Sequence, residues 1–242
     1  MAGHSKWANI KHRKEKSDSK KGKTYSKIGR EIAIAVKQGG PTPESNNKLR
    51  DVIAKAKAEN MPNDSIMRSI KKAAGDIDSA DYEEITYEGY GPGGVALIVE
   101  AMTENRNRTA GDVRHLFDKF GGNMGTTGCV SFMFNRKGIM IVSREARRDS
   151  DAVMLEALEA GAEDIVELDE VYEITTAPED FSGVRESLEA LGYEFESAGI
   201  EMIPVTTVSL TDEKQNISFE KLIDNLEDHD DVQNVFHNCE NG

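Results

Sequence analysis

The chain has 242 residues, 38% of them hydrophobic, with two cysteines and a formal net charge of −14. Its longest uninterrupted apolar runs are five residues, whereas a membrane-spanning helix needs about 20, so transmembrane segments are excluded. Two thiols do not make a secreted disulfide framework, and the lysine-rich opening lacks the apolar core of a signal peptide, so we expect a cytoplasmic protein.

Charge is strongly segregated along the chain. Residues 1–72 contain 18 Lys+Arg and 7 Asp+Glu, whereas residues 73–242 contain 12 Lys+Arg and 37 Asp+Glu. Residues 1–72 therefore have a net charge of +11, and residues 73–242 have a net charge of −25. Because a basic segment attracts polyanions and an acidic body is repelled by them, we expect the first part to face nucleic acid.

The basic part predicts an arm followed by a small helical bundle. Residues 1–23 are polar and basic without a sustained apolar period, which indicates a flexible or weakly helical arm. Three segments with apolar residues at helical spacing follow, over about 24–37, 46–60 and 63–74. The tripeptide at 39–41 (GGP), Pro62 and Gly75 end them. We predict a basic helical domain over residues 1–75.

The acidic stretch 76–84 is interpreted as a linker, because the sign of the charge changes there. Beyond it the pattern predicts a strand over 95–101, a helix over 106–120 and a strand over 130–134, where apolar residues alternate. After Pro204 the same βαβ order returns, with a strand over 205–210, a helix over 216–227 and a strand over 231–236.

Between these two βαβ segments the pattern predicts a series with the order βαββαβ, which is the ferredoxin-like unit. Its strands are expected over 139–142, 164–168, 171–175 and 193–203. Its first helix is expected over 150–160, with Met154, Ala157 and Leu158 facing inward. Its second helix is expected over 180–191, with Val184, Leu188 and Leu191 facing inward.

The predicted fold class is therefore α+β, with an N-terminal three-helix domain and two ferredoxin-like α/β domains, one inserted into the other. The split domain comprises residues 76–136 and 205–242, and the inserted domain comprises residues 137–204. The alternative is three separate small modules in succession.

The basic part also supplies the predicted nucleic-acid contacts. Lysine and arginine neutralise phosphates and release counterions, which gives affinity independent of sequence. Aromatic rings among these charges are suited to stacking on unpaired bases. The alternative is a solvated tail that only aids solubility. The predicted nucleic-acid-binding residues are Lys6, Trp7, Lys11, His12, Arg13, Lys14, Lys16, Lys20, Lys21, Lys23, Lys27, Arg30, Lys55, Lys57, Arg68, Lys71 and Lys72.

The second and third predicted helices, which also carry Lys48 and Arg50, offer a second phosphate-contacting surface. The alternative is ordinary exposed helix faces, since lysine is a good helix former. No cluster of Asn, Gln and Arg on one helix face is suited to base edges. Backbone contact is therefore favoured over sequence readout.

Two further segments have a possible phosphate-binding role. The glycine-rich residues 89–94 lack the Lys-Ser/Thr of a P-loop and precede a strand, so we interpret them as a tight turn. Arg106 and Arg108 begin a helix, where they would meet phosphate beside its positive end. Alternatively, these arginines pair with carboxylates while Asn107 or Thr109 caps the helix.

No arrangement typical of an enzyme is present in the sequence. The five histidines lie in no H-E-x-x-H or C-x-x-C context, and the spacing of His229, His237 and Cys239 matches no standard metal site. The carboxylates are spread along helix faces rather than paired for acid–base chemistry. We therefore expect no catalytic residues, no metal, no cofactor and no small-molecule substrate.

Several segments resemble the YebC/PmpR family. They are MAGHSKWANIKHRK (1–14), YEGYGPGG (87–94), NRNRT (105–109), GGNMG (121–125), GAED (161–164) and DDVQNV (230–235). The resemblance covers essentially the whole chain, and its opening motif is highly specific. Because that motif begins at residue 2, we expect no organelle presequence before it, which fits a bacterial protein.

The resemblance implies a helical domain and two α/β domains with a cleft between them, in a cytoplasmic protein without catalytic activity. Some family members are described as transcriptional regulators that bind DNA. Others, including a mitochondrial relative that activates translation of a cytochrome oxidase subunit, resemble ribosome-associated factors that ease difficult peptide synthesis. We therefore expect nucleic acid as the partner, either DNA or ribosomal RNA, and no membrane partner. The aromatic residues among the lysines favour unpaired bases.

Overall fold

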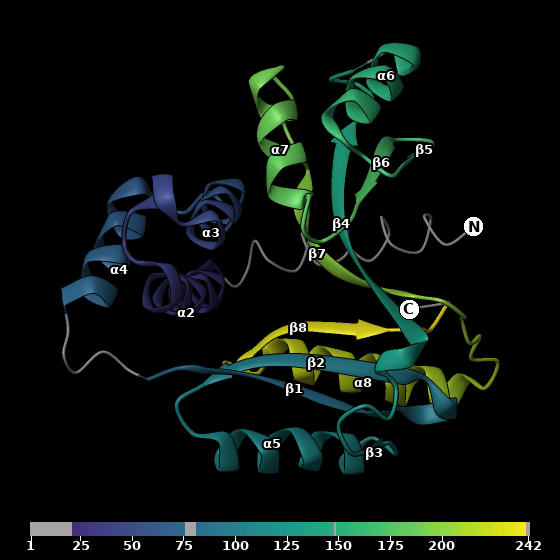
Figure 1. Cartoon of the computed structure of the whole chain (residues 1–242). Helices are drawn as coiled ribbons and strands as arrows, with labels where there is room; N and C mark the ends of the chain where they lie inside the picture. Colours follow the sequence, from purple (N-terminus) through teal and green to yellow (C-terminus); the bar gives the residue numbers. More distant parts are fainter. Residues whose placement is uncertain (1–20, 76–80, 148, 241–242) are drawn as a thin grey trace.

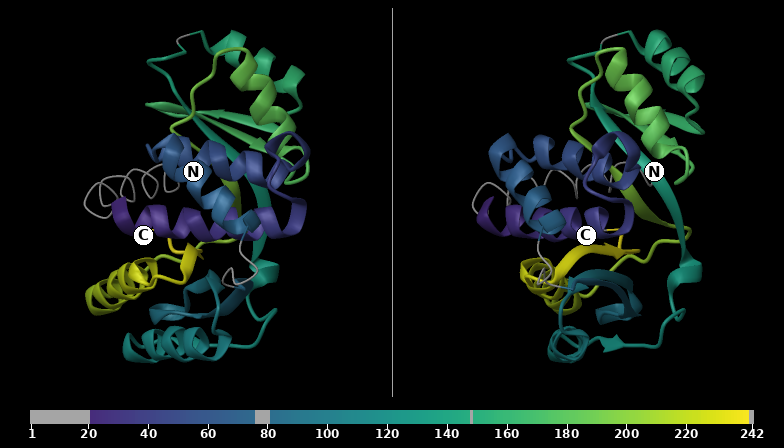
Figure 2. Two further views of the ribbon diagram at one scale, coloured as in Figure 1. Left: turned by 90° about the vertical axis from the view of Figure 1, so that its left-hand side faces the viewer. Right: turned by 60° about the vertical axis from the view of Figure 1, so that its left-hand side comes forward.

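A computed structural model of the chain describes residues 21–75, 81–147 and 149–240. It contains a helical unit and two four-stranded antiparallel sheets with helices packed on them (Figure 1). The helical unit lies beside both sheets, on one side of the molecule (Figure 2). The predicted α+β fold class is confirmed.

The helical unit consists of α2 (Lys21–Gly39), α3 (Asn47–Ala58) and α4 (Asn63–Gly75), with a short 3-10 helix (Pro43–Ser45) before α3. The three predicted helices are therefore confirmed. Their apolar faces meet in one core that includes Ile28, Ile32 and Leu49. Asn46 caps the start of α3, because its side chain accepts a hydrogen bond from the amide of Leu49. The same side chain donates a hydrogen bond to the carbonyl of Ala35 on α2.

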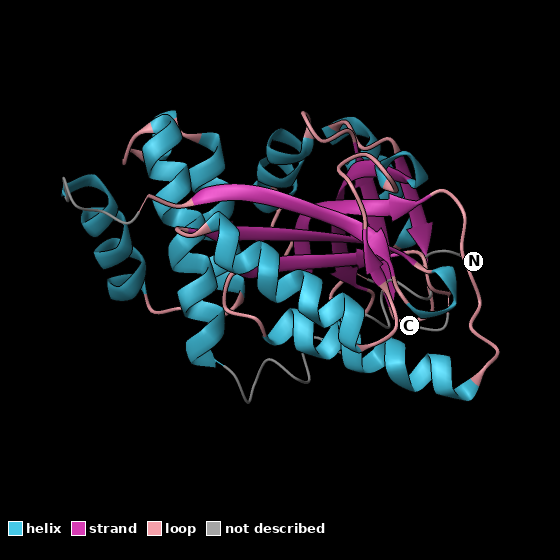
Figure 3. Cartoon of the chain, turned by 90° about the horizontal axis from the view of Figure 1, so that it is seen from below, coloured by secondary structure: helices cyan, strands magenta, loops and turns pink. Residues whose placement is uncertain are grey.

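The first sheet has the strand order β3-β1-β2-β8, and all its neighbouring strands are antiparallel. Its strands are β1 (Glu83–Tyr90), β2 (Ala96–Thr103), β3 (Asn123–Met124) and β8 (Val232–His237). Helices α5 (Arg106–Lys119) and α8 (Glu213–Asp228) cover one face of it (Figure 3). Leu97 and Val99 of β2 pack there with Phe117 and Phe219, whereas Ile98 between them packs on the opposite face.

The second sheet has the strand order β5-β6-β4-β7 and is also antiparallel. Its strands are β4 (Phe134–Ser143), β5 (Asp164–Glu167), β6 (Val171–Thr176) and β7 (Ser197–Pro204). With α6 (Ser150–Ala160) and α7 (Phe181–Ala190), it has the predicted βαββαβ order. Its core includes Met140, Tyr172 and Leu188.

The first sheet is completed by β8 only after the whole of the second sheet, which is the arrangement expected of an inserted unit. Ile98 and Phe236 of the first sheet share a small core with Phe134, the first residue of β4. The long strand β4 leads from this junction into the second sheet (Figure 1). The domain boundaries given above stay predictions.

Three predicted segments around the first sheet differ in the structure. The end of the expected linker belongs to β1, where Ile85 and Tyr87 pack on the core while Glu83 and Glu84 hide this alternation in the sequence. The expected strand over 130–134 is mostly a 3-10 helix (Ser131–Met133) followed by β4. The expected strand over 205–210 forms only one isolated bridge, between Val208 and Cys239.

The predicted inward face of α6 is confirmed at Ala157 and wrong at Met154 and Leu158. Val153 and Ala157 are buried, whereas Met154 and Leu158 are exposed by 36% and 56%. Apolar residues lie on both sides of this helix, so their periodicity does not select one face. On α7, Val184 and Leu188 are buried as predicted, and Leu191 just beyond its end is 51% exposed.

Candidate nucleic-acid interface

Eight predicted nucleic-acid-binding residues lie outside the described residues, so their role stays a prediction. They are Lys6, Trp7, Lys11, His12, Arg13, Lys14, Lys16 and Lys20. Lys21 is the first residue of α2, and the remaining eight predicted residues lie on α2, α3 and α4. These helices divide the cations into two groups with different surroundings.

The first group consists of four exposed cations, which we call the free cations: Lys57 near the end of α3, and Arg68, Lys71 and Lys72 on α4. The buried residues of α4 are Ile66 and Ile70, so its cations lie on the outward side of the helix. Within the described part of the chain, the side chains of these four residues have no hydrogen-bonding or ion-pair partner. Their charge is therefore available to an external anion.

Other cations of α3 bind inside the molecule. Lys55 Nζ lies 2.7 Å from Glu31 Oε1 on α2. Burial alone would lower the pKa of Lys55, but Glu31 outweighs that effect and the pKa is raised. Arg50 Nε lies 2.7 Å from Glu186 Oε1 on α7, and Lys48 Nζ lies 2.6 Å from a carboxylate of β1. These contacts join α3 to α2, to α7 and to β1.

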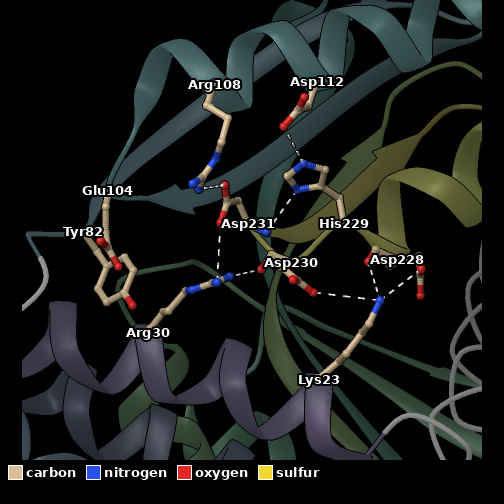
Figure 4. Close-up of a pocket in the computed structure, with 10 residues that line it drawn as sticks. All are labelled: Lys23, Arg30, Tyr82, Glu104, Arg108, Asp112, Asp228, His229, Asp230 and Asp231. Atoms are coloured by element: carbon tan, nitrogen blue, oxygen red, sulfur yellow. Dashed lines mark hydrogen bonds and ion pairs between the residues drawn. The ribbon is translucent and has the colours of Figure 1, made fainter.

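The second group is a row of three cations along one face of α2, Lys23, Lys27 and Arg30, which we call the cation row. It faces residues 227–231, the end of α8 and the turn that leads to β8, which contain four carboxylates and are together called the acidic turn. A cavity of about 550 Å³ lies between them and α5 (Figure 4). The cavity therefore has walls from the helical unit and from the first sheet.

Every member of the cation row contacts an oxygen of the acidic turn. Lys23 Nζ lies 3.1 Å from Asp228 Oδ2 and 3.9 Å from Asp230 Oδ1. Lys27 Nζ donates to the backbone carbonyl of the first residue of the turn at 2.7 Å. Arg30 donates to the backbone carbonyl of Asp230. The row is therefore occupied by the protein itself.

Asp231 anchors the acidic turn to α5. Its carboxylate is buried and accepts hydrogen bonds from Arg108 at 2.9 Å and from Thr109 Oγ1 at 2.7 Å, while Arg30 Nη2 lies 3.5 Å away. Burial alone would raise the pKa of Asp231, but Arg108, Thr109 and Arg30 outweigh it and lower the pKa. Arg108 thus pairs with a carboxylate, whereas Arg106 is exposed and 4.0 Å from a carboxylate of β1.

The glycine-rich residues 89–94 include the end of β1 and most of the short connection to β2, in agreement with their interpretation as a tight turn. Gly93 has a φ of 68°, a conformation that favours glycine. The cap of α5 is Asn105, whose side chain accepts a hydrogen bond from the backbone amide three residues later, rather than Asn107 or Thr109.

Glu88 on β1 is a buried carboxylate that no pattern in the sequence marks. It accepts hydrogen bonds from the amides of Gly128, Val130 and Ser131, at 2.8 to 2.9 Å. Burial would raise the pKa of Glu88, but these hydrogen bonds outweigh it and lower the pKa. Glu88 therefore holds the segment that replaces the expected strand and carries Phe132, which is 74% exposed.

Across residues 21–75, 81–147 and 149–240, no three His, Cys, Asp or Glu side chains are grouped so as to hold a metal ion. His229 accepts a hydrogen bond from the amide of Asp231, and its other ring nitrogen lies 3.4 Å from Asp112. His237 packs edge-on against Phe219. The same described residues contain no helix with the length and apolar character that crossing a bilayer requires.

Family comparisons agree with this division into a helical unit and two sheets. A family model described as the TACO1/YebC protein N-terminal domain matches residues 5–76, and one described as the TACO1/YebC second and third domain matches residues 82–239. The chain belongs to the TACO1/YebC family. The resemblance seen in the sequence motifs is thereby confirmed.

Relatives of this TACO1/YebC family member are similar over their whole length. A "probable transcriptional regulatory protein" of Acetivibrio thermocellus is 68% identical over 238 residues, which cover 98% of both chains. One of Caldicellulosiruptor saccharolyticus with the same description is 63% identical over 240 residues, which cover 99% of both chains. The crystal structure of the conserved hypothetical protein Aq1575 from Aquifex aeolicus has a TM-score of 0.82 and 47% identity, covering 92% of this chain and 91% of that one.

Proposed function

We propose that this protein is a cytoplasmic, non-enzymatic regulator of gene expression that binds nucleic acid, and specifically a DNA-binding transcriptional regulator. The observation that carries the proposal is the group of free cations on α3 and α4. They are exposed and unpaired within the described residues, and residues 73–242 of the same chain carry a net charge of −25. Such a group attracts phosphate, while the acidic body keeps the rest of the surface away from it.

The relatives support the transcriptional form of the proposal, because two that are 68% and 63% identical over nearly full length are described as probable transcriptional regulatory proteins. The basic arm adds a second group of predicted contacts to the free cations. Arg106 is exposed at the start of α5 and is proposed as an additional contact. Arg108 is less suitable, because Asp231 already binds it.

The test is binding of the full chain to promoter duplexes and to a random duplex at one fixed salt concentration. A specific regulator prefers its operator by about a thousandfold or more. Equal affinity for every duplex, including the promoters of genes whose transcription changes on deletion of this protein, would reject specific DNA recognition.

A ribosome-associated translation factor that binds ribosomal RNA is the second candidate. It is favoured by the composition of α4, which between residues 65 and 75 presents Arg68, Lys71 and Lys72 but no Asn or Gln for reading base edges. Backbone contact of this kind suits structured RNA as well as duplex DNA.

Sedimentation of lysate after DNase treatment separates the two candidates. A ribosome-bound protein travels with the ribosomes after DNase treatment and leaves them when the basic arm is deleted. A protein that stays at the top of the gradient in mild salt would reject this second candidate and leave duplex DNA as the target to examine.

A further inference from the structure

The cation row of α2 is one of the predicted phosphate-binding surfaces, yet the acidic turn already occupies it. Lys23 binds carboxylates, and Lys27 and Arg30 bind backbone carbonyls of that turn. A phosphodiester backbone offers the same kind of partner, namely a line of oxygen acceptors with negative charge. The acidic turn and nucleic acid would therefore compete for the same three side chains.

None of the hydrophobic core clusters in the part of the chain that the structure describes joins the helical unit to the sheets, although Ile34 of α2 is buried outside the cluster of the helical unit. Among the described residues, the hydrophobic core of the helical unit contains only residues of α2, α3, α4 and the turn between α3 and α4. The cores of the two sheets contain none of these residues. The unit is instead held by the acidic turn and by contacts of α3, such as Arg50 with Glu186. The exposed pairs, such as Lys23 with Asp228, are individually weak and are screened by salt, whereas Arg30 with Asp231 is largely buried.

The closed contact has one electrostatic feature that is unfavourable, at Lys27, and one that is favourable, at the end of α8. Burial lowers the pKa of Lys27 to about 8, although Glu227, Asp228 and Asp230 each favour its charged form. The carboxylates of Glu227 and Asp228 also lie in the last turn of α8, where the helix dipole disfavours negative charge and no basic residue compensates it. The cations of α2 supply the missing compensation.

The acidic turn is also anchored by α5, in addition to its contacts with Arg30 of α2. Asp231 accepts a hydrogen bond from Thr109 of α5. It also accepts one from Arg108, and its amide donates one to His229 (Figure 4). In contrast, Asp228 and Asp230 are exposed by 45% and 70% and contact Lys23. Release of α2 would therefore leave the turn in place and free the cation row.

We propose that the acidic turn is an internal competitor for nucleic acid, which masks the cation row of α2 until a phosphate backbone displaces it. This inference rests on the proposed function, because it assumes that the helical unit binds nucleic acid. Displacement adds Lys23, Lys27 and Arg30 to the free cations of α3 and α4. The apparent affinity of the cation row for nucleic acid is therefore the affinity of the open form multiplied by the fraction of molecules in which the turn is open.

The experiment compares the wild-type full chain with the variant Asp228→Asn/Asp230→Asn. A matched control, Glu213→Gln/Glu220→Gln, removes the same charge from exposed positions of α8. Affinities for a random 20-base-pair duplex and for a ribosomal RNA hairpin are measured by fluorescence anisotropy at fixed salt. We expect the acidic-turn variant to bind at least about fivefold more tightly than the control. Thermal unfolding verifies that all three proteins are folded, and Asp230→Asn alone provides a milder variant.

The outcomes separate the inference from the proposed function. If wild type binds and the acidic-turn variant binds no better than the control, the inference is overturned while the proposed function stands. If neither wild type nor any variant binds either nucleic acid, both are overturned. If only the acidic-turn variant binds, the turn masks the surface completely in the wild type, which supports the inference.

Discussion

The cation row of α2 and the free cations of α4 are both basic faces of one small helical unit, but their surroundings are opposite. Each member of the row contacts the acidic turn, whereas Arg68, Lys71 and Lys72 have no partner among the described residues. A count of charges in the sequence treats the two faces as equal. The folded chain assigns one face to an intramolecular contact and leaves the other for an external anion.

The largest effect is expected at Asp231, the carboxylate of the acidic turn that is both buried and paired. Replacement Asp231→Asn removes the carboxylate that Arg108 and Arg30 contact, and we expect it to lower the free energy of unfolding by about 3 kcal/mol. Urea denaturation at neutral pH measures this change. The control Asp230→Asn alters a carboxylate that is 70% exposed and should stay within about 0.5 kcal/mol of wild type. Equal losses in the two variants would contradict the assigned anchoring role.

The free cations should influence binding and not stability. Replacement of Lys57, Arg68, Lys71 and Lys72 by alanine is expected to weaken duplex binding by about 10- to 100-fold at low salt, with a salt dependence reduced by about one phosphate contact per residue. Titrations at several salt concentrations measure both effects. The control replaces one arginine and three lysines on exposed positions of α5 and α8, namely Arg114, Lys119, Lys214 and Lys221. An equal loss in this control would mean that net charge alone governs binding.

Glu88 is a buried carboxylate whose partners are backbone amides, so its replacement should affect stability. Replacement Glu88→Gln leaves the amides of Gly128, Val130 and Ser131 with a weaker acceptor, and we expect a loss of about 1–2 kcal/mol at neutral pH. Because the folded-state pKa of Glu88 is lowered, its stabilisation is complete above the unfolded value of about 4.3 and disappears as the pH falls through the folded value.

The pH dependence provides the control for that prediction. Unfolding free energies measured from about pH 5 downward should fall less steeply for Glu88→Gln than for wild type. The exposed substitution Glu220→Gln should leave the curve unchanged. Parallel curves for wild type and Glu88→Gln would show that the carboxylate is not stabilised by the loop.

The smallest effect is expected at an exposed pair. Lys48 Nζ lies 2.6 Å from Glu84 Oε1, but the two side chains are 41% and 45% exposed. Replacement Lys48→Ala should therefore cost less than about 1 kcal/mol at low salt and almost nothing at high salt. Thermal unfolding of wild type and Lys48→Ala at two salt concentrations measures this loss of stability. A loss as large as that of Asp231→Asn would mean that surface pairs also hold the helical unit firmly.

Much of the fold follows from local patterns in the sequence. The helical unit and the βαββαβ series were predictable because apolar residues recur at clear spacings and Gly or Pro lies at or shortly after the end of each helix. β1 was missed because Glu83 and Glu84 open it, and the strand expected near residue 130 was wrong because Glu88 binds the backbone there from 42 positions away. Neither cause is visible within a short window.

The candidate site was predictable in its residue types and not in its partners. Clustering of lysine and arginine identified Lys23 and Lys27 together with Lys71 and Lys72. However, the groups that bind Lys23 and Lys27 lie 205 and 200 positions further along the chain. Only the complete fold brings them together, so the sequence could not separate the masked cations from the free ones.

The place of β8 in the first sheet has a consequence for the time at which each part of the molecule forms during synthesis. All strands of the second sheet have been made once Pro204 is added, whereas β2 must wait for Val232–His237 before its second edge is covered. At the usual speed of translation, the time between the synthesis of β2 and the synthesis of β8 is on the order of 10 s. The acidic turn is made equally late, so the helix that carries Lys23, Lys27 and Arg30 emerges long before its carboxylates exist, beside the RNA of the ribosome that is making it.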